Sequence, residues 1–358
     1  MRYSRFVDGV IDDVDPWEKP HILVERLLSF SHTQSVAPIL YYETDGYLAM
    51  VSRFREVLAP AFRFVLGAPD LVEDLLDKAR FNRLAKELSL PVPVSFDIAP
   101  DVDLAALALE FPLIVKPLTR RDRDGGWVTL AGDAKALVLG TGDDFRRLMP
   151  LLRATGISLL GQRLIPGGET SVESYHMYAR RDGEVVADFT GKKLRTVPAQ
   201  FGHSTALITT DAPDVVETGR AIVRKLGLGG VAKLDFKRDA RGQLHLLEVN
   251  PRFTLWNHLG AEAGVNIPSL VYDDLTGRRL SGVKAGRAGI SWCDVPKDVR
   301  AARAAAIPLP SWLWWAARAN IKTDLALDDP MPFLRGRILS KLTRVGQRAR
   351  SRRSNATR

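Results

Sequence analysis

The sequence predicts a fold in which helices and strands are mixed, of the α+β or α/β class, divided into two or three subdomains. Its 358 residues are enough to bury a sizeable hydrophobic core. Hydrophobic residues make up 46% of the chain and charged residues 26%, a balance typical of globular proteins. Short apolar segments of strand length alternate with amphipathic segments of helical spacing along most of the sequence.

The clearest helical segment lies before residue 90. Leu71, Leu75, Ala79, Leu84 and Leu88 fall near one face at helical spacing, which predicts a single amphipathic helix across this stretch. A Pro-Val-Pro segment follows and ends it.

Strands are expected next. The segment FPLIVKP at 111–117 reads as an apolar strand ending in Lys116, a polar loop follows at 119–127, and WVTLAG at 127–132 reads as another strand. Residues 158–275 alternate strands with helices, and VAKLDFK and QLHLLEV pair as a hairpin.

This hairpin carries two carboxylates inside apolar strands. If its turn comprises the four residues 239–242, Asp235 lies opposite Leu246 and diagonal to Glu248, on the same face of the ladder. Asn250 continues that face. Diagonal neighbours lie about 7–8 Å apart, so these side chains can act on one group.

Two carboxylates and an amide are oxygen ligands suited to a hard ion, and a pair of Mg²⁺ ions about 3.5–4 Å apart fits their spacing. Mn²⁺ is an alternative to Mg²⁺, whereas zinc prefers His and Cys ligands. Ordinary surface charges are the competing interpretation, which the cost of placing charges within the apolar strands LDF and LLEV disfavours.

The same residues resemble a known signature. LDF with EVNPRF, in which Glu248 follows Asp235 by thirteen residues, resembles the magnesium motif of the ATP-grasp superfamily. LLDKARFNRLAKELSLPVP, FPLIVKP and GQRLIPGGET resemble further motifs of that superfamily, in the same order. The chain looks most like stand-alone carboxylate–amine ligase-like proteins, including those similar to D-aspartate ligase and to the ATP-binding domain of carbamoyl-phosphate synthase.

The resemblance implies roles for individual residues. Lys78 and Lys116 would hold the nucleotide phosphates, Glu169 the ribose, and Asp235, Glu248 and Asn250 the metal. The adenine would lie against the linker formed by Gln162, Arg163, Leu164 and Ile165. Arg163 departs from the family pattern, which often has an acid at this position; recognition of adenine by the backbone would survive that change.

Basic side chains supply the catalytic candidates. Arg252 follows the metal ligands and presents a fixed fork of donors for a transferring phosphoryl group, with a structural salt bridge as the alternative. Lys192, Lys193 and Arg195 form a basic cluster, of which one is expected to meet phosphate or a substrate carboxylate. We take Lys193 and Arg195 as the candidates, and the sequence does not choose between them.

The expected fold is an ATP-grasp fold, with two α+β lobes gripping ATP, preceded by a truncated Rossmann-like N-terminal subdomain. The expected parts are an N-terminal subdomain with the first helix at 1–95, a small lobe at 96–160, a large lobe with the metal site at 161–280, a helical extension at 281–334 and a basic tail at 335–358. The family usually begins with a further strand and helix. Either the native start lies upstream, or part of this subdomain has been lost.

The function implied is an ATP- and Mg²⁺-dependent ligase that activates a carboxylate as an acyl phosphate for attack by an amine. The alternatives are a carboxylase or phosphotransferase of the same fold, and a nucleotide-binding protein without turnover. The expected partners are a small-molecule carboxylate and an amine; the oligomeric state stays open.

Charge and composition restrict the other partners. The net charge is +9, but residues 335–358 hold nine Lys or Arg and no acid, so the rest of the chain is neutral and specific nucleic-acid binding is not expected. The tail is either solvated or weakly attracted to an anionic membrane surface or RNA, and the cluster Trp312–Trp315 is either packed or part of an interface or membrane-facing patch. No apolar run is long enough to span a membrane, and the single cysteine, Cys293, fits a reducing compartment, so a cytoplasmic location is expected.

Overall fold

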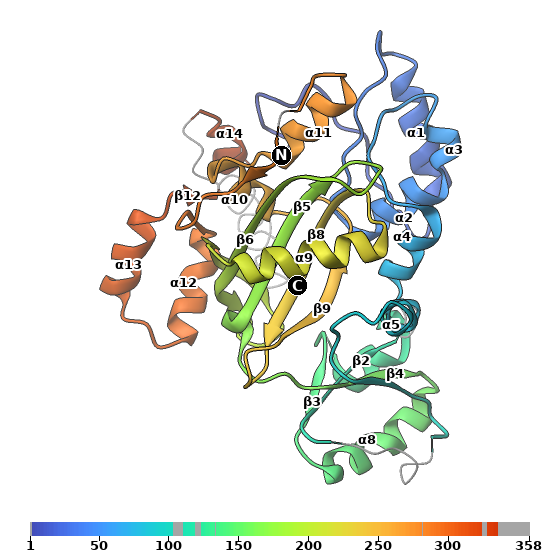
Figure 1. Ribbon diagram of the computed structural model, residues 1–358, viewed down its shortest axis with the longest axis vertical. Coiled ribbons are helices and arrows are strands. Elements are labelled where there is room, and N and C mark those ends of the chain that lie inside the picture. Colours follow the sequence, from blue (N-terminus) through green and yellow to red (C-terminus); the bar gives the residue numbers. More distant parts are fainter. Residues whose placement is uncertain are drawn as a thin grey trace, which may run out of the picture.

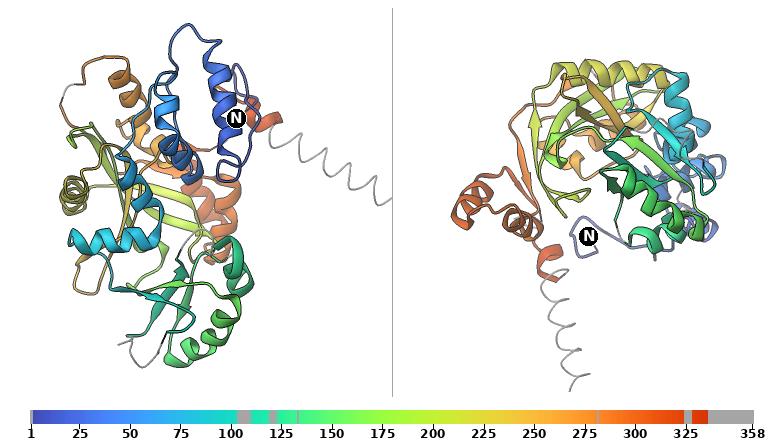
Figure 2. Two further views of the ribbon diagram at one scale, coloured as in Figure 1. Left: turned by 90° about the vertical axis from the view of Figure 1, so that its right-hand side faces the viewer. Right: turned by 90° about the horizontal axis from the view of Figure 1, so that it is seen from below.

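The computed structural model describes residues 2–102, 110–118, 123–132, 134–280, 282–323 and 328–335. A large twisted sheet with helices on both faces forms the centre, a smaller sheet with its own helix lies below it, and N-terminal helices lie beside both (Figure 1). The turned views show the C-terminal helices at the outer edge of the large sheet (Figure 2). These mixed lobes confirm the predicted α+β class.

The N-terminal part is mainly helical. Its helices are α1 (Pro20–Ser31), α2 (Asp45–Arg53), α3 (Arg55–Leu58) and α4 (Pro69–Leu76). They enclose a core of their own around Val24, Leu48 and Phe62. Between these helices, Ile39 and Arg63 form an isolated parallel β-bridge.

The prediction of one helix across residues 71–88 is wrong, because the chain breaks at Asp77. This residue is extended, with φ −106° and ψ 125°, and its carboxylate accepts the backbone N–H of Arg80 at 3.0 Å. It therefore caps a second helix, α5 (Lys78–Glu87), and an N-cap of this kind competes with continuation of the preceding helix. The break places Lys78 at the first residue of α5.

The small lobe is an antiparallel sheet in the order β1-β4-β2-β3. Its strands are β1 (Ser95–Ile98), β2 (Leu113–Pro117), β3 (Leu137–Leu139) and β4 (Leu159–Arg163). Helix α8 (Gly142–Thr155) packs on this sheet through Phe145, Leu148 and Leu152. Thr141 and Asp144 form a capping box that fixes its start.

The strand predicted at 127–132 is also wrong. Residues Arg123–Trp127 form a turn that is kinked at Gly125, and Val128–Ala131 form the short helix α7. The edge strand is β3 instead. Trp127 is fully buried and its indole N–H donates to the carbonyl of Ala134 at 2.6 Å. The apolar residues of this segment thus close the core of the small lobe and pair with no strand.

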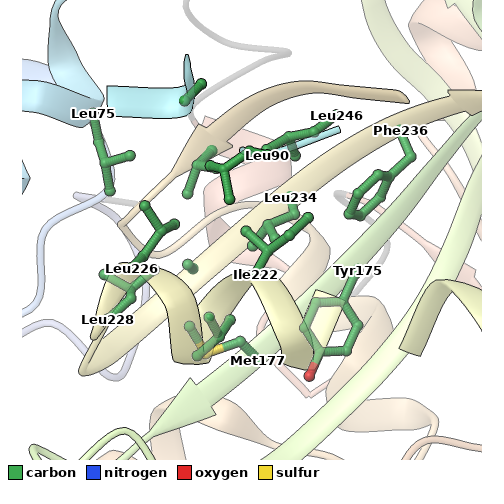
Figure 3. Close-up of a cluster of buried hydrophobic side chains, with 14 of the residues drawn as sticks. Leu75, Leu90, Tyr175, Met177, Ile222, Leu226, Leu228, Leu234, Phe236 and Leu246 are labelled. Carbon is green, nitrogen blue, oxygen red and sulfur yellow. The ribbon is translucent and has the colours of Figure 1, made fainter. Parts of the chain in front are cut away.

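The large lobe has eight strands in the order β12-β11-β7-β6-β5-β8-β9, with β10 paired to β6. They are β5 (Val172–Ala179), β6 (Val185–Val197), β7 (His203–Thr210), β8 (Gly230–Arg238), β9 (Leu244–Asn250), β10 (Lys284–Ala285), β11 (Ser291–Cys293) and β12 (Ile321–Lys322). Helix α9 (Pro213–Leu226) covers one face, where Ile222 and Leu226 pack on Met177 and Leu234 (Figure 3). Helices α10 (Trp256–Glu262) and α11 (Ile267–Leu275) pack against the other.

The β8–β9 hairpin has a different register from the one predicted. Asp235 pairs directly with Glu248, not with Leu246, because the ladder shifts between Asp235 and Phe236. Phe236 pairs with Leu246, so Leu247 is the extra residue of a β-bulge. The two acids nevertheless share one side of the hairpin.

The C-terminal region adds β11 and β12 to the sheet and carries α12 (Val295–Ala304), α13 (Leu309–Arg318) and α14 (Met331–Phe333). Trp312 is buried beneath α13 while Trp314 is exposed, so the Trp cluster is partly packed and partly open. Within the described ranges, no helix combines the length and the apolar character that a membrane span requires. All but the first residue of the basic tail lies outside the described residues.

Candidate active site

A cleft of about 670 Å³ lies where the small lobe, the large lobe and the N-terminal helices meet. The small lobe contributes the ends of β2 and β4, the large lobe contributes η3 (Glu169–Ser171) with β6, β8 and β9, and α5 contributes its first turn. Eleven of the thirteen predicted site residues line this cleft: Lys78, Lys116, Gln162, Arg163, Leu164, Ile165, Glu169, Lys193, Asp235, Glu248 and Asn250.

Two lysines extend from the small-lobe side. Lys116 lies on β2, and its Nζ is 3.4 Å from the side-chain oxygen of Gln162. Burial lowers the pKa of Lys116, and the charges of Glu248 and Glu169 across the cleft partly oppose this effect. Lys78 Nζ donates to the carbonyl of Pro117 at 3.1 Å, so the start of α5 is tied to the end of β2.

The linker after β4 forms one wall of the cleft. The amide of Leu164 donates to the carbonyl of Pro112 at 3.2 Å, and the side-chain NH₂ of Gln162 donates to Ser95 at 3.1 Å. The guanidinium of Arg163 is exposed and lies 3.7 Å from Glu110. The backbone of this linker is therefore held by the sheet, while the Arg163 side chain is engaged at the surface.

Glu169 and Lys193 form an ion pair across the large-lobe side of the cleft. Lys193 Nζ lies 2.7 Å from a carboxylate oxygen of Glu169, and only 13% of each side chain is exposed. Burial acts to lower the pKa of Lys193, but the nearby carboxylates of Asp235 and Glu169 raise it above its ordinary value. Lys193 therefore keeps its positive charge in a shielded position.

The predicted metal ligands meet at the end of the hairpin. Asp235 is buried. Its carboxylate accepts a hydrogen bond from Ser174 Oγ at 2.5 Å and forms an ion pair with Lys233. Burial acts to raise its pKa, but Lys233 and Lys193 hold the pKa of this carboxyl below its usual range. Glu248, directly opposite, accepts the Asn250 side-chain N–H at 3.0 Å.

The chemistry of this donor set fits a magnesium ion. Asp235 and Glu248 supply two carboxylates, and the side-chain oxygen of Asn250 adds a neutral ligand atom beside them. Mg²⁺ is usually bound in this way, by one or two carboxylates with phosphate oxygens and water completing the shell. The set contains no His or Cys, the ligands that zinc prefers.

Arg252 is turned toward the N-terminal part. Its Nε donates to Asp45 at 2.5 Å, one terminal nitrogen donates to the carbonyl of Glu43 at 3.3 Å, and the other donates to the side-chain oxygen of Asn250 at 3.3 Å. Arg252 thus links the end of β9 to the first residue of α2. Arg252 therefore forms a structural salt bridge and also orients the side chain of Asn250. Its partner Asp45 lines the cleft.

The structure corrects the expectation for Arg195. Its guanidinium forms a two-point ion pair with Asp298 of α12, at 2.7 and 2.9 Å, and stacks on Trp315. The ladder shifts on both sides of Arg195, which redirects this side chain away from the face that carries Lys193. Arg195 does not line the cleft and is not a catalytic candidate.

Comparison with known proteins agrees with this arrangement. Residues 159–295 match the family model described as "ATP-grasp in the biosynthetic pathway with Ter operon". That range includes the whole hairpin with Asp235, Glu248 and Asn250, and the linker from Gln162 to Glu169. Residues 159–295 are therefore similar to an ATP-grasp domain.

Relatives extend the likeness beyond this domain. The D-aspartate ligase of Enterococcus faecium is 23% identical over 317 residues, covering 83% of this chain and 74% of that protein. A D-alanine–D-alanine ligase of Sodalis glossinidius is 30% identical over 214 residues, 55% of this chain and 56% of that protein. The chain therefore spans just over half the length of the second relative.

A solved structure shows the same fold. Biotin carboxylase from Campylobacter jejuni, in a complex with β-γ-ATP, superposes with a TM-score of 0.58 at 14% identity, covering 76% of this chain and 62% of that one. At this identity the likeness concerns the ATP-grasp fold alone.

Two cationic residues of the large lobe were not predicted from the sequence. Lys233 pairs with Asp235, and Lys237 lines the cleft with its Nζ donating to the carbonyl of Gly167 at 2.7 Å. Burial lowers the pKa of Lys237. The segment KLDFK places Lys233, Asp235 and Lys237 at alternate positions of one strand, so their side chains share a face. This two-residue spacing is the sequence feature from which both lysines could have been predicted to lie beside Asp235.

Proposed function

We propose that this chain is an ATP- and Mg²⁺-dependent ligase that activates a small-molecule carboxylate as an acyl phosphate and joins it to an amine. One observation carries the proposal. Lys78, Lys116 and Lys193 line the same cleft as Asp235 and Glu248, so cations suited to bind phosphate share a cleft with carboxylates suited to hold a hard ion. The named ligases among the relatives support the choice of reaction.

The nucleotide would lie with its adenine against the backbone of Leu164 and Ile165 and its ribose toward Glu169. The triphosphate would then extend past Lys116 and Lys78 toward Lys193. Lysine suits this purpose because its ammonium is a compact charge with three donors. Glu169 would exchange part of its contact with Lys193 for the ribose hydroxyls.

Asp235, Glu248 and Asn250 would hold Mg²⁺, with Mn²⁺ as an alternative and two ions as the proposed number. When bound there, the metal neutralises charge on the phosphate oxygens. Ser174 holds one oxygen of Asp235 and thereby orients the carboxylate. Arg252 orients Asn250 through its side-chain oxygen.

The chemistry proceeds in two substitutions. An oxygen of the substrate carboxylate attacks the γ-phosphorus as the bond to the β–γ bridging oxygen breaks, and ADP leaves. The amine nitrogen then attacks the acyl carbon, the bond to the phosphate oxygen breaks, phosphate leaves, and the nitrogen loses a proton. Lys116 and Lys193 would stabilise charge on the transferring group in the first step, which needs no side-chain nucleophile.

The substrates would enter from the N-terminal side of the cleft. Trp17 and Asp45 line that side, and Arg252 binds Asp45 there. The acidic and basic groups of this pair suit small molecules that carry both an amino and a carboxyl group, such as amino acids.

A panel of D- and L-amino acids, hydroxy acids and dipeptides, offered in pairs with Mg²⁺-ATP, tests the proposal. We expect ADP and phosphate release that requires both an acid and an amine, with the amide product detected by mass spectrometry. Release that requires bicarbonate would indicate a carboxylase, and a stable phosphorylated product formed without an amine would indicate a phosphotransferase. Tight nucleotide binding with no ADP formation for any pair would indicate a binding protein without turnover.

A further inference from the structure

Helix α13 presents an apolar face to solvent. Leu309, Leu313 and Trp314 are 47%, 53% and 62% exposed. The helix forms the outer edge of the large lobe in both the front view and the view from below, so no other element that the structure describes lies over it (Figures 1 and 2). Single exposed apolar residues are common on proteins, but neighbouring Leu and Trp residues on one projecting helix are a candidate contact surface.

The exposed charges of α12 and α13 have one sign. Between Val295 and Thr323 the chain has a single acid, Asp298, which is fully buried and paired with Arg195. The basic residues of this stretch are Lys297, Arg300, Arg303, Arg318 and Lys322. Lys297 is paired with Asp294 and Lys322 is partly buried, whereas the three arginines are exposed. The exposed arginines of α12 and α13 therefore have no exposed acid beside them in this stretch of the sequence, and Arg318 lies on the same helix as the apolar face.

Trp314 and Arg318 join these two properties at one point. The Arg318 guanidinium lies 3.8 Å from the centre of the Trp314 ring. Trp has an affinity for the boundary between lipid headgroups and acyl chains, and Arg extends its charged end toward phosphate while its stem covers apolar surface. An apolar face bordered by Arg is the pattern of helices that lie in the plane of a membrane surface.

We propose that the α13 face docks on the surface of an anionic lipid bilayer. The positive charges of Arg300, Arg303 and Arg318 are complementary to anionic headgroups, and Leu309, Leu313 and Trp314 enter the acyl boundary. A nucleic acid would be attracted by the arginines but gains nothing from the leucines. A second copy of the chain would oppose like charges across the contact, and the chain's own terminal segment, with nine basic residues and no acid, carries the same sign.

The terminal segment strengthens the electrostatic part of the proposal through its sequence alone. Basic residues near an anionic membrane surface each contribute attraction that falls off within a Debye length, about 10 Å at 0.1 M salt. Apolar insertion and basic charge together supply the two signals that stable peripheral attachment requires.

Sedimentation of the full chain with vesicles tests the proposal. We expect binding to vesicles of equal parts phosphatidylcholine and phosphatidylglycerol, and much weaker binding to phosphatidylcholine alone. The double variant Leu313→Ser/Trp314→Ser should lower the partition coefficient by about tenfold or more, because it removes the side chains that enter the acyl boundary. Leu151→Ser, at a residue of α8 that is 54% exposed, is the matched control and should bind like the unaltered chain.

Four results would overturn the proposal. One is the absence of binding to the anionic vesicles, and another is an equal loss in the Leu151→Ser control. A third is binding to a single-stranded RNA of mixed sequence that is stronger than binding to vesicles and indifferent to the double substitution. The fourth is a concentration-dependent dimer, seen by analytical ultracentrifugation, that the double substitution abolishes, because the face would then be an interface between copies.

Discussion

Asp235 and Glu248 lie directly opposite each other across the β8–β9 hairpin, and a β-bulge at Leu247 puts them there. Below the bulge the ladder pairs Phe236 with Leu246, and continuing that register would set Asp235 against Leu247 and turn Glu248 to the other side. The bulge aligns the two carboxylates at the mouth of the cleft. Bulges are often found beside active sites for this reason.

Glu248→Gln should remove metal binding while keeping the fold, because the amide has nearly the same shape but no negative charge. We expect affinity for Mn²⁺, measured by electron paramagnetic resonance, to fall about a hundredfold. The control is Glu217→Gln on the exposed side of α9, which should leave Mn²⁺ affinity unchanged. Equal Mn²⁺ affinity in the Glu248 variant and the unaltered chain would refute the ligand assignment.

Lys116 should make nucleotide affinity sensitive to alkaline pH. Burial lowers its pKa below the ordinary value of 10.5, so its ammonium loses the proton earlier than other lysines as pH rises. The attraction to phosphate is complete below that lowered pKa and is lost above it. The dissociation constant of ATP, measured by calorimetry from neutral pH to about pH 10, should therefore increase across this range.

Lys116→Arg provides the control for that titration, since arginine stays protonated throughout. Its ATP affinity should be nearly constant over the same range. A parallel loss of affinity in both proteins would assign the pH dependence to another group.

Asp298 should be essential for the stability of the C-terminal region. Its buried carboxylate accepts the guanidinium of Arg195, the hydroxyl of Thr205 at 2.8 Å and the indole N–H of Trp312 at 2.8 Å. Asp298→Ala leaves the Arg195 charge buried without a counter-ion, which costs about 3–5 kcal/mol of unfolding free energy. Urea denaturation measures this loss.

The exposed pair Asp143–Arg146 on α8 gives a reference for that value. Asp143→Ala removes an ion pair that water screens, so the loss of unfolding free energy should be much smaller than for Asp298→Ala. Losses of equal size in the two variants would show that burial of Asp298 has no energetic consequence.

Cys293 should be unreactive in the native protein. Burial and the neighbouring Asp298 carboxylate raise the pKa of its thiol to about 12, so little thiolate exists near neutral pH. Alkylation by iodoacetamide should be about a thousandfold slower than in urea-unfolded protein. Because the chain has one cysteine, mass spectrometry reports this site alone; comparable rates in the two states would contradict the burial.

The sequence predicted correctly that Asp235 and Glu248 lie on the same face of the hairpin, although the predicted pairing of Asp235 with Leu246 was wrong. The turn contains five residues, 239–243, where four were expected, because Arg238 pairs with Leu244. The bulge then adds a second residue to the same strand. Two shifts of one residue sum to two, and a strand repeats its faces every two residues, so Asp235 and Glu248 stay together.

Two other features were not predicted from the sequence, each for its own reason. The apolar spacing around Leu71 and Leu84 continues across Asp77, so periodicity alone did not reveal the cap that divides the helix. Arg195 lies two residues after Lys193 and looks equivalent to it in sequence. Its partner, Asp298, is 103 residues away, and local spacing contains no signal for that pair.

The central claim is that the substrate carboxylate becomes an acyl phosphate, and the fate of a carboxylate oxygen tests it most directly. With an acid and amine pair that supports ADP release, the carboxylate is labelled with heavy oxygen and the released phosphate is analysed by mass spectrometry. If the carboxylate attacks the γ-phosphorus, one labelled oxygen passes into phosphate at each turnover. Unlabelled phosphate formed together with the amide product would contradict the account.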